Sequence, residues 1–283
     1  MDPLAIILVL TAAVLHATWS AMVKNGDEPW IRMGIVTCIT GSIGFILLFF
    51  VDAPAPESWP YLAASIAIHQ VYFCFVCFGY QFGTLSQVYP IQRGVAPMLV
   101  AIGGYWFVGE TLNTQGIISV SLISIAILSL AFGQNGKFTS GPAVPIALFT
   151  GILIAGYTVI DGKGVRLAGD NILGYIAWLF AIEEIPFTLL CLWVVKRNPK
   201  QITERHILNS VGGGIMAFLA YGLVIWAMSL SHLTYVSALR ETSVILAAWI
   251  GTQLMGEPFG KYRIIAATLI TIGVLILQIS DTG

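Results

Sequence analysis

Long apolar runs occupy almost the whole chain and leave only short polar connections between them. A helix needs about 20 mostly apolar residues to cross a bilayer, and ten of the runs approach this length. They are residues 4–23, 30–51, 61–82, 87–108, 116–132, 144–160, 172–195, 207–230, 234–255 and 262–279. The runs are too continuous for the alternating pattern of a membrane barrel. The sequence therefore predicts an all-α integral membrane protein with ten transmembrane helices.

Composition supports this prediction. Hydrophobic residues make up 57% of the 283 residues, charged residues make up 10%, and the mean hydropathy is +0.87. This is too little polar surface to cover a water-soluble particle of this size. All four cysteines lie within apolar runs, where a small apolar side chain is their ordinary role. Cys74 and Cys77 form a C-x-x-C without a second pair, so no metal or cofactor is expected.

The second half of the chain repeats a pattern from the first half. Residues 93–130 match residues 240–277 at a shift of 147 positions, which places Arg93 on Arg240. The same shift places Gly109-Glu110 on Gly256-Glu257, and a shift of 138 brings Ala17-Thr18-Trp19 onto Ala155-Gly156-Tyr157. We therefore predict two units, residues 1–133 and 142–280, with five spans each. An odd number of spans inverts the second unit, and this architecture lets a transporter expose one site to each side in turn.

Orientation can be predicted from the basic residues in the connections. One side of the predicted bundle carries nine of them and the other carries two, Lys163 and Arg166. The nine are Lys24, Arg32, Lys137, Lys196, Arg197, Lys200, Arg205, Lys261 and Arg263. Because basic connections face the cytoplasm, this asymmetry predicts that both termini lie outside the cytoplasm.

Several short motifs resemble the drug/metabolite transporter superfamily, and specifically its ten-helix members with two EamA-type repeats. The motifs are His16-Ala17-Thr18-Trp19-Ser20 with Lys24, Tyr89-Pro90-Ile91-Gln92-Arg93-Gly94, Gly109-Glu110, Arg240-Glu241-Thr242-Ser243 and Gly256-Glu257-Pro258. The likeness covers nearly the whole chain, but the family is chemically broad. It indicates the fold and the general role, and it leaves the substrate open.

The resemblance implies a secondary transporter of small organic molecules, often an exporter of amino acids, other metabolites or toxic compounds. It also implies a central cavity lined by the first, third, fourth, sixth, eighth and ninth helices, with the fifth and tenth mainly structural. Many relatives have both termini in the cytoplasm, whereas the loop charges of this chain predict the reverse.

Arg93 and Arg240 are the strongest candidate substrate anchors. Placing an ionisable group inside a membrane costs free energy, so each such residue is a candidate for a functional role. The repeat places the two arginines at equivalent depths, and two converging guanidinium groups would suit a carboxylate or phosphate-like group. The alternative is that each arginine snorkels or pairs with a structural acid. Glu241, next to Arg240, is included among the candidate substrate-binding residues.

Glu183 and Glu184 lie at the middle of the seventh run. Two adjacent carboxyl groups at this depth are not expected to be ionised together, because burial and mutual repulsion disfavour the second charge. One hypothesis is that a carboxyl here exchanges a proton during transport. The alternative is that one acid bonds a neighbouring helix while the other faces a water-filled crevice.

The other candidate substrate contacts are histidines and aromatic residues. His16 could bond substrate or relay protons, and Trp19 with its repeat mate Tyr157 could form aromatic walls. The third helix offers His69 and Tyr80, and the eighth offers Tyr221 and Trp226, as expected for a mostly aromatic pocket with a few polar anchors. Each of these residues could equally serve helix packing.

Together these features predict a secondary active transporter for a small anionic or zwitterionic metabolite such as an amino-acid-like compound, and the family resemblance implies export. The expected setting is the inner or plasma membrane, with lipid and substrate as partners, protons as a possible coupling ion, no nucleic acid, and a monomer or homodimer. The rivals are a passive channel and an intramembrane enzyme using His16, His69, Glu183 and Glu184. The enzyme is disfavoured because no catalytic motif is present.

Overall fold

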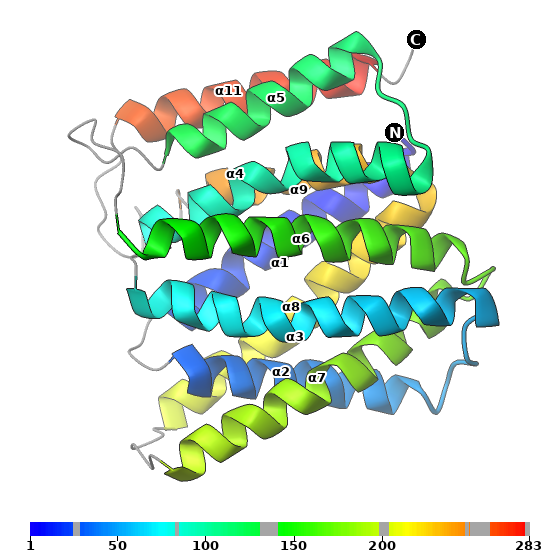
Figure 1. Ribbon diagram of the computed structural model, residues 1–283, viewed down its shortest axis with the longest axis vertical. Coiled ribbons are helices and arrows are strands. Elements are labelled where there is room, and N and C mark those ends of the chain that lie inside the picture. Colours follow the sequence, from blue (N-terminus) through cyan, green and yellow to red (C-terminus); the bar gives the residue numbers. More distant parts are fainter. Residues whose placement is uncertain are drawn as a thin grey trace.

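The computed structural model describes residues 1–24, 29–82, 85–130, 141–197, 204–246, 249 and 261–280, and these fold into helices with short connections (Figure 1). The helices are α1 (Pro3–Lys24), α2 (Pro29–Leu47), α3 (Trp59–Phe82), α4 (Leu85–Gly103), α5 (Thr114–Ser129), α6 (Ala143–Arg166), α7 (Ile172–Arg197), α8 (Glu204–Leu230), α9 (Leu233–Arg240) and α11 (Lys261–Ser280). A short 3-10 turn, η1 (Pro56–Ser58), precedes α3, and a π-helical turn, η2 (Gly104–Val108), ends α4. After a turn at Glu241, residues 242–246 are helical again.

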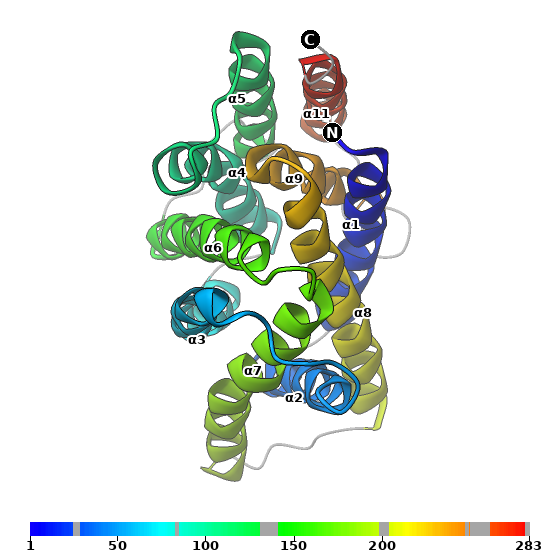
Figure 2. The same cartoon turned by 90° about the vertical axis from the view of Figure 1, so that its right-hand side faces the viewer.

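The helices form two layers that face each other (Figure 2). One layer holds α5, α4, α6, α3 and α7, and the other holds α11, α9, α1, α8 and α2. Each layer therefore combines three consecutive helices from one half of the chain with the first two helices of the other half. The halves are interleaved, so neither half is a separate bundle.

Equivalent helices of the two halves make equivalent contacts. Helix α1 packs on α8 as α6 packs on α3, and α2 packs on α8 as α7 packs on α3. Three pairs of corresponding helices, one helix from each half, contact each other across the two layers. They are α2 with α7, α4 with α9, and α5 with α11. The pair α5 and α11 lies at one edge of the molecule, away from its centre (Figures 1 and 2). This agrees with the expectation that the fifth and tenth helices are mainly structural.

Glycines explain how closely α2 approaches α7. Gly34, Gly41 and Gly44 lie on one face of α2, and a Cβ atom added to each would come within 3.0 Å of an atom on α7. At Gly41 that atom is the Cβ of Glu184, at 2.9 Å. Small residues let helix backbones approach closely in a membrane, where no hydrophobic force draws helices together. The glycine face of α2 thus brings its neighbouring threonines within reach of the α7 carboxyl groups.

The outer surface fits a hydrocarbon solvent. Six stretches are long and apolar enough to cross a membrane, namely Pro3–Ser20, Trp30–Leu47, Pro56–Gly79, Ala143–Arg166, Ile172–Val194 and Ile207–Leu230. Two shorter apolar helices, Thr114–Ser129 and Ile265–Leu277, accompany them among the described residues. Large apolar side chains such as Phe50, which is 78% exposed, cover the outside. Such exposure is costly in water but not in lipid.

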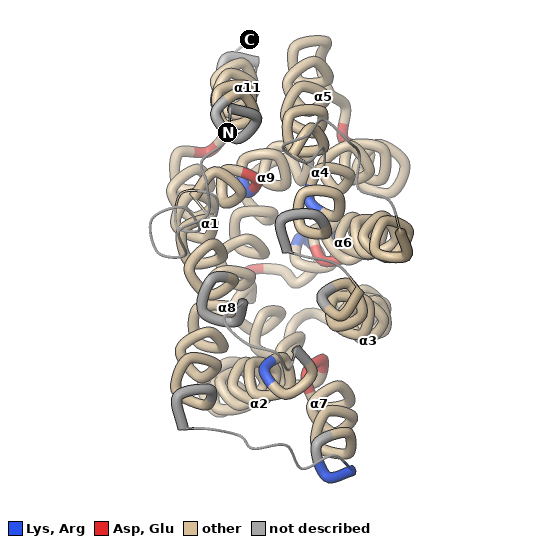
Figure 3. Tube along the Cα trace, turned by 90° about the vertical axis from the view of Figure 1, so that its left-hand side faces the viewer, with Lys and Arg blue, Asp and Glu red and all other residues tan. Residues whose placement is uncertain are grey.

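Both chain termini lie at the same end of the helices, called the terminal end below (Figure 1). The opposite end, where α1 and α7 finish and α2 and α8 begin, is called the far end. Charged residues are sparse along the helices, and several of them lie between the two layers (Figure 3). One basic residue used to predict orientation is placed differently from the expectation: Arg32 lies in the first turn of α2 and is buried, so it does not belong to a connection.

Candidate functional site

A cavity lies between the two layers near the centre of the molecule. It encloses about 680 Å³ of space not occupied by atoms, open solvent included. Most of its described lining is apolar or aromatic, with two arginines, two glutamates and two histidines. The lining residues are Ala12, His16, Trp19, Met33, Val36, Thr37, Thr40, His69, Tyr72, Phe73, Arg93, Tyr157, Phe180, Glu183, Glu184, Ala217, Ala220, Tyr221, Val224 and Arg240. A largely apolar lining with a few polar anchors is typical of small-molecule sites.

The cavity lies near the middle of the helices that line it. Helix α1 begins at the terminal end and contributes residues 12–19, whereas α2 begins at the far end and contributes residues 33–40.

Arg93 and Arg240 form the basic side of the cavity. They come from α4 and from the last residue of α9, and each is only 3% exposed. Nε of Arg93 lies 3.0 Å from Oε2 of Glu241, which follows Arg240 in sequence. The Nε and Nη2 atoms of Arg240 are buried, and no described residue forms a hydrogen bond with them. The structure thus brings the repeat-related arginines to one cavity and leaves donors of Arg240 free.

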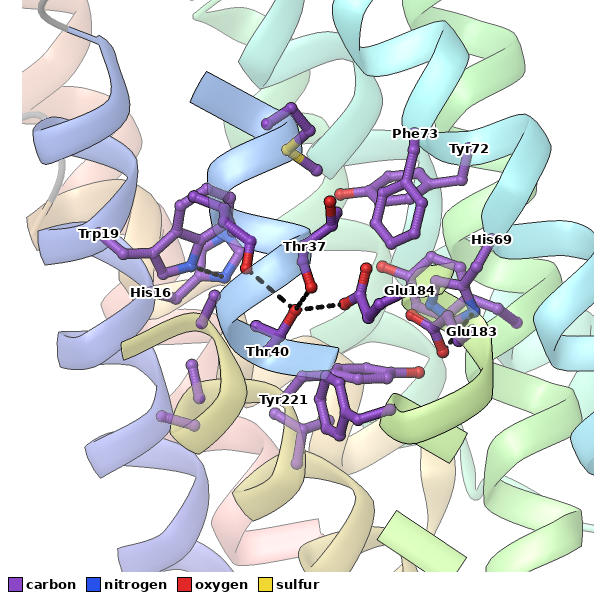
Figure 4. A pocket seen from close by; sticks show the side chains of 18 of the residues that line it. His16, Trp19, Thr37, Thr40, His69, Tyr72, Phe73, Glu183, Glu184 and Tyr221 are labelled. Carbon is purple, nitrogen blue, oxygen red and sulfur yellow. Dashed lines mark hydrogen bonds and ion pairs between the residues drawn. The ribbon is translucent and has the colours of Figure 1, made fainter. Parts of the chain in front are cut away.

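His16 and Trp19 lie on the α1 wall, within one turn of each other. Nε1 of Trp19 donates a hydrogen bond of 3.2 Å to Nδ1 of His16, and the two rings meet edge to face at 5.2 Å (Figure 4). Because Nδ1 accepts this bond, the proton of a neutral imidazole lies on Nε2. His16 is also within electrostatic range of Arg93 and Arg240.

Glu183 and Glu184 form the acidic side on α7. Thr40 of α2 donates a hydrogen bond of 2.7 Å from its hydroxyl to Oε1 of Glu184 (Figure 4). The Oε2 atoms of both glutamates are buried without a hydrogen-bond partner. Gln70 of α3 donates at 2.6 Å to the backbone carbonyl of Glu183 and ties this part of α7 to α3. Glu183 and Glu184 are both among the residues that line the cavity.

His69 lies beside Glu183 on the side of the cavity opposite His16 and Trp19 (Figure 4). Its Nδ1 atom is 3.0 Å from the Ser65 carbonyl, and since a carbonyl can only accept, this contact places the proton of the neutral ring on Nδ1. The distance of 3.6 Å between Nδ1 and Oε2 of Glu183 is too long for a hydrogen bond. The imidazole ring stacks on Tyr157 with ring centroids 4.1 Å apart.

Aromatic rings form the wall between the basic and acidic sides. Tyr157 of α6 contacts His69, Tyr72 and Tyr221, and it is within electrostatic range of both arginines and of Glu183. The rings of Phe73 and His69 lie side by side, with their centroids 5.8 Å apart. The predicted aromatic contribution of Trp19 and Tyr157 is therefore placed at the cavity, although on opposite layers.

Asp161 is a buried carboxylate that the sequence reasoning missed. It lies on α6 and is fully buried. It accepts hydrogen bonds from the hydroxyl groups of Tyr175 at 3.0 Å and Tyr221 at 2.5 Å, and Ser65 is a third hydroxyl partner. The apolar run 144–160 ends one position before Asp161, whereas α6 continues to Arg166. Asp161 thereby fixes the cavity-lining Tyr221 and joins four helices just beyond the cavity.

The terminal end is closed around Glu110. Gly109 has φ 77°, the left-handed conformation that suits glycine, and it turns the chain so that Glu110 caps α9. Both carboxylate oxygens accept from the backbone N–H of Leu233, at 2.8 and 2.9 Å. Arg166 donates to Glu110 at 2.8 Å and also to the backbone carbonyl of Ser231. Gly109-Glu110 thus has a structural role at the end of α4, while its repeat mate Gly256-Glu257 lies outside the described residues.

Other candidates lie away from the cavity or cannot be placed. Trp226 packs against the apolar core that includes Leu233, and it does not line the cavity. Glu241 is fully buried behind Arg93 and also lies off the lining. The side chain of Tyr80 falls outside the described residues.

The set of lining helices differs from the one that the family resemblance implies. Helices α2 and α7 both contribute, through Thr37 and Thr40 and through the glutamate pair. The sequence signal that could have revealed α2 is the threonine pair on a helix whose glycines allow close packing. Among the described residues, no group of three or more potential ligands is arranged to hold a metal ion.

Comparisons with known proteins fit this geometry. The model of the EamA-like transporter family matches residues 3–132 and again residues 141–279. A solved structure described only as the crystal structure of a protein aligns with a TM-score of 0.77 and 15% identity, covering 97% of this chain and 96% of the other. At that identity the likeness shows the fold alone. No curated protein matches the chain. The two family matches together span nearly every residue, so the chain belongs to the EamA-like transporter family of the drug/metabolite transporter superfamily, as a multi-pass membrane protein.

Proposed function

We propose that this protein is a secondary active transporter that exports a small anionic or zwitterionic metabolite, such as an amino-acid-like compound, across the inner or plasma membrane. Ten spans in two inverted repeats, residues 1–133 and 142–280, surround the binding site. Arg93 and Arg240 bind the anionic group of the substrate, and His16, Trp19, His69, Tyr157 and Tyr221 form the rest of the pocket.

The observation that carries this proposal is the convergence of two repeat-related guanidinium groups on one cavity. Arg93 and Arg240 are both buried between apolar layers, and donors of Arg240 have no hydrogen-bond partner. An unpaired buried cation is strongly unfavourable, and an anionic ligand relieves this cost when it binds. A guanidinium group also matches the planar geometry of a carboxylate.

The acidic side supports two further parts of the proposal. Glu183 and Glu184 line the same cavity, and we propose that their unpartnered Oε2 atoms accept bonds from a substrate ammonium group. Without such a group, two neighbouring buried carboxyls do not both stay ionised, so at least one carries a proton. Exchange of that proton for substrate couples transport to a proton gradient.

The arrangement of helices supports alternating access. The cavity lies between the two layers near mid-span, and the Glu110 and Asp161 networks join helices on its terminal-end side. The symmetric packing of equivalent helices supports an inverted repeat, whose two halves can exchange open and closed conformations. Since the halves are interleaved, we propose that the two layers, each built from both repeats, rock about the site.

Counterflow in proteoliposomes tests this proposal. Vesicles containing the purified protein are loaded with one unlabelled metabolite from a panel of amino acids and organic acids, and entry of the labelled form is followed. A secondary transporter shows saturable entry with a transient overshoot. Flux that rises in proportion to concentration, without overshoot, would indicate a passive channel instead. Chemical conversion of the metabolite by the purified protein would support the intramembrane enzyme.

A further inference from the structure

The ion pair of Arg93 and Glu241 links the two halves of the chain at the basic side of the cavity. Arg93 lies on α4, and Glu241 follows the last residue of α9. Nε of Arg93 and Oε2 of Glu241 are 3.0 Å apart, and the two side chains are 3% and 0% exposed. At this distance and burial, the carboxylate compensates the charge of Arg93 far more effectively than it would in water.

The pair compensates charge without satisfying directional bonding. Neither the Nε and Nη2 atoms of Arg93 nor the two carboxylate oxygens of Glu241 make a hydrogen bond of acceptable geometry. A forked arginine–carboxylate pair would use two parallel bonds. Donors of Arg93 therefore remain available to a ligand in the cavity, while its charge is already balanced from behind.

Arg240 differs from Arg93 in this respect. No described acid lies within ion-pair distance of Arg240, and Glu241, its sequence neighbour, points to Arg93 instead. Other charged or titratable groups near Glu241 are Arg240 itself and Tyr89 of α4, while His16 of α1 is near both arginines. With Glu241 ionised, the two arginines and the one carboxylate give the basic side a single net positive charge.

We propose that Glu241 sets the charge selectivity of the cavity: by neutralising Arg93 it leaves one uncompensated positive charge, so that the site selects a monoanionic group over a dianionic one. This inference rests on the proposed function, because it concerns the same anion-binding arginines. In this proposal Glu241 does not contact the substrate. It lies outside the cavity and acts on substrate charge selectivity through its ion pair with Arg93.

Three aromatic probes of similar size test the charge count. Benzoate is a monoanion at neutral pH, phthalate is a dianion, and benzamide is a neutral isostere of benzoate. Their dissociation constants are measured by calorimetry on the purified full-length protein at one ionic strength. The natural protein is expected to bind benzoate more tightly than either other probe. In Glu241→Gln, the ratio of phthalate to benzoate affinity is expected to rise by about tenfold or more, because one further positive charge is uncompensated.

Two further variants separate charge from structure. In Arg93→Gln, Glu241 neutralises Arg240, so benzoate is expected to lose its advantage over benzamide. The double variant Arg93→Gln with Glu241→Gln leaves Arg240 as the single charge, and it is expected to regain preference for benzoate. Glu57→Gln, the same substitution at an exposed acid, is the matched control and should bind all three probes like the natural protein.

The outcomes distinguish failure of the Glu241 inference from failure of the proposed anion-binding function. Equal binding of benzoate and benzamide to the natural protein would overturn the anion site itself and the inference with it. Preference for benzoate in the natural protein, with an unchanged phthalate-to-benzoate ratio in Glu241→Gln, would overturn the inference alone. If Glu241→Gln fails to fold, the comparison of Arg93→Gln with the double variant decides: no recovery of benzoate preference contradicts the role of Glu241.

Discussion

The hydroxyl of Tyr221 donates a hydrogen bond of 2.5 Å to Asp161, and this bond ties a residue of the cavity wall to a carboxylate buried outside the cavity. Tyr175 donates to the same carboxylate at 3.0 Å but does not line the cavity. Two tyrosines thus share one acceptor, and only one of them faces the proposed substrate.

This difference gives a matched pair of variants. Tyr175→Phe and Tyr221→Phe each remove one hydrogen bond to a charged group, so each should lower stability by about 1.5–3 kcal/mol. Only Tyr221→Phe should also weaken substrate binding. Thermal unfolding and equilibrium binding on the purified variants measure the two effects. Equal effects of both variants on binding would show that Tyr221 acts only through the fold.

Lysine substitutions test how the arginines bind. Arg93→Lys and Arg240→Lys keep the positive charge, so the protein should fold and retain the compensation of Glu241. Each loses the planar fork of donors, and affinity for a carboxylate substrate should fall by about tenfold or more. Binding and thermal unfolding are measured together. Arg197→Lys at the exposed end of α7 is the matched control, and unchanged affinity in the Arg240→Lys variant would remove Arg240 from the site.

Neutralising the acidic side tests proton coupling. The double variant Glu183→Gln with Glu184→Gln keeps the shape of both side chains but binds no exchangeable proton. Transport driven by a pH gradient should be lost, while counterflow without a gradient continues. Both fluxes are measured in the same proteoliposome preparation. Gradient-driven transport equal to that of the natural protein would assign the glutamates a purely structural role.

How far the sequence predicts this molecule depends on the level of detail. Apolar runs predict most helices because hydrocarbon demands a minimum length, and the Arg93–Arg240 repeat indicates which positions are equivalent. Rotation of a helix about its axis is harder to predict when apolar residues surround it. Trp226 was therefore placed in the pocket although it packs in the core, and Thr40 was missed although it contacts Glu184.

Buried charges near helix ends are a second limit. Asp161 was overlooked because a charged residue was read as the end of an apolar run, whereas three hydroxyl partners satisfy its carboxylate inside the helix bundle. The sequence also does not reveal that Glu241 is the partner of Arg93, because its position next to Arg240 suggests that it pairs with Arg240 instead. Such contacts depend on tertiary packing, and sequence spacing alone does not reveal them.

The Glu110 network predicts a strong stability effect at the terminal end. Glu110→Ala removes the cap of α9 and leaves Arg166 without its carboxylate partner. A loss of about 2–4 kcal/mol is expected from the combined cap and charge-assisted bond. Thermal unfolding measures the loss, with Glu57→Ala as the control at an exposed position. A melting temperature equal to that of the control would show that the network does not stabilise this end.

The central claim is that guanidinium groups from both repeats meet in one cavity and bind the anionic group of the substrate. Its most direct test is equilibrium binding of benzoate and benzamide to the natural protein and to the double variant Arg93→Gln with Arg240→Gln. We predict that the natural protein prefers benzoate, and that the double variant loses benzoate binding while its affinity for benzamide is unchanged. Equal benzoate affinity in the two proteins would contradict the claim.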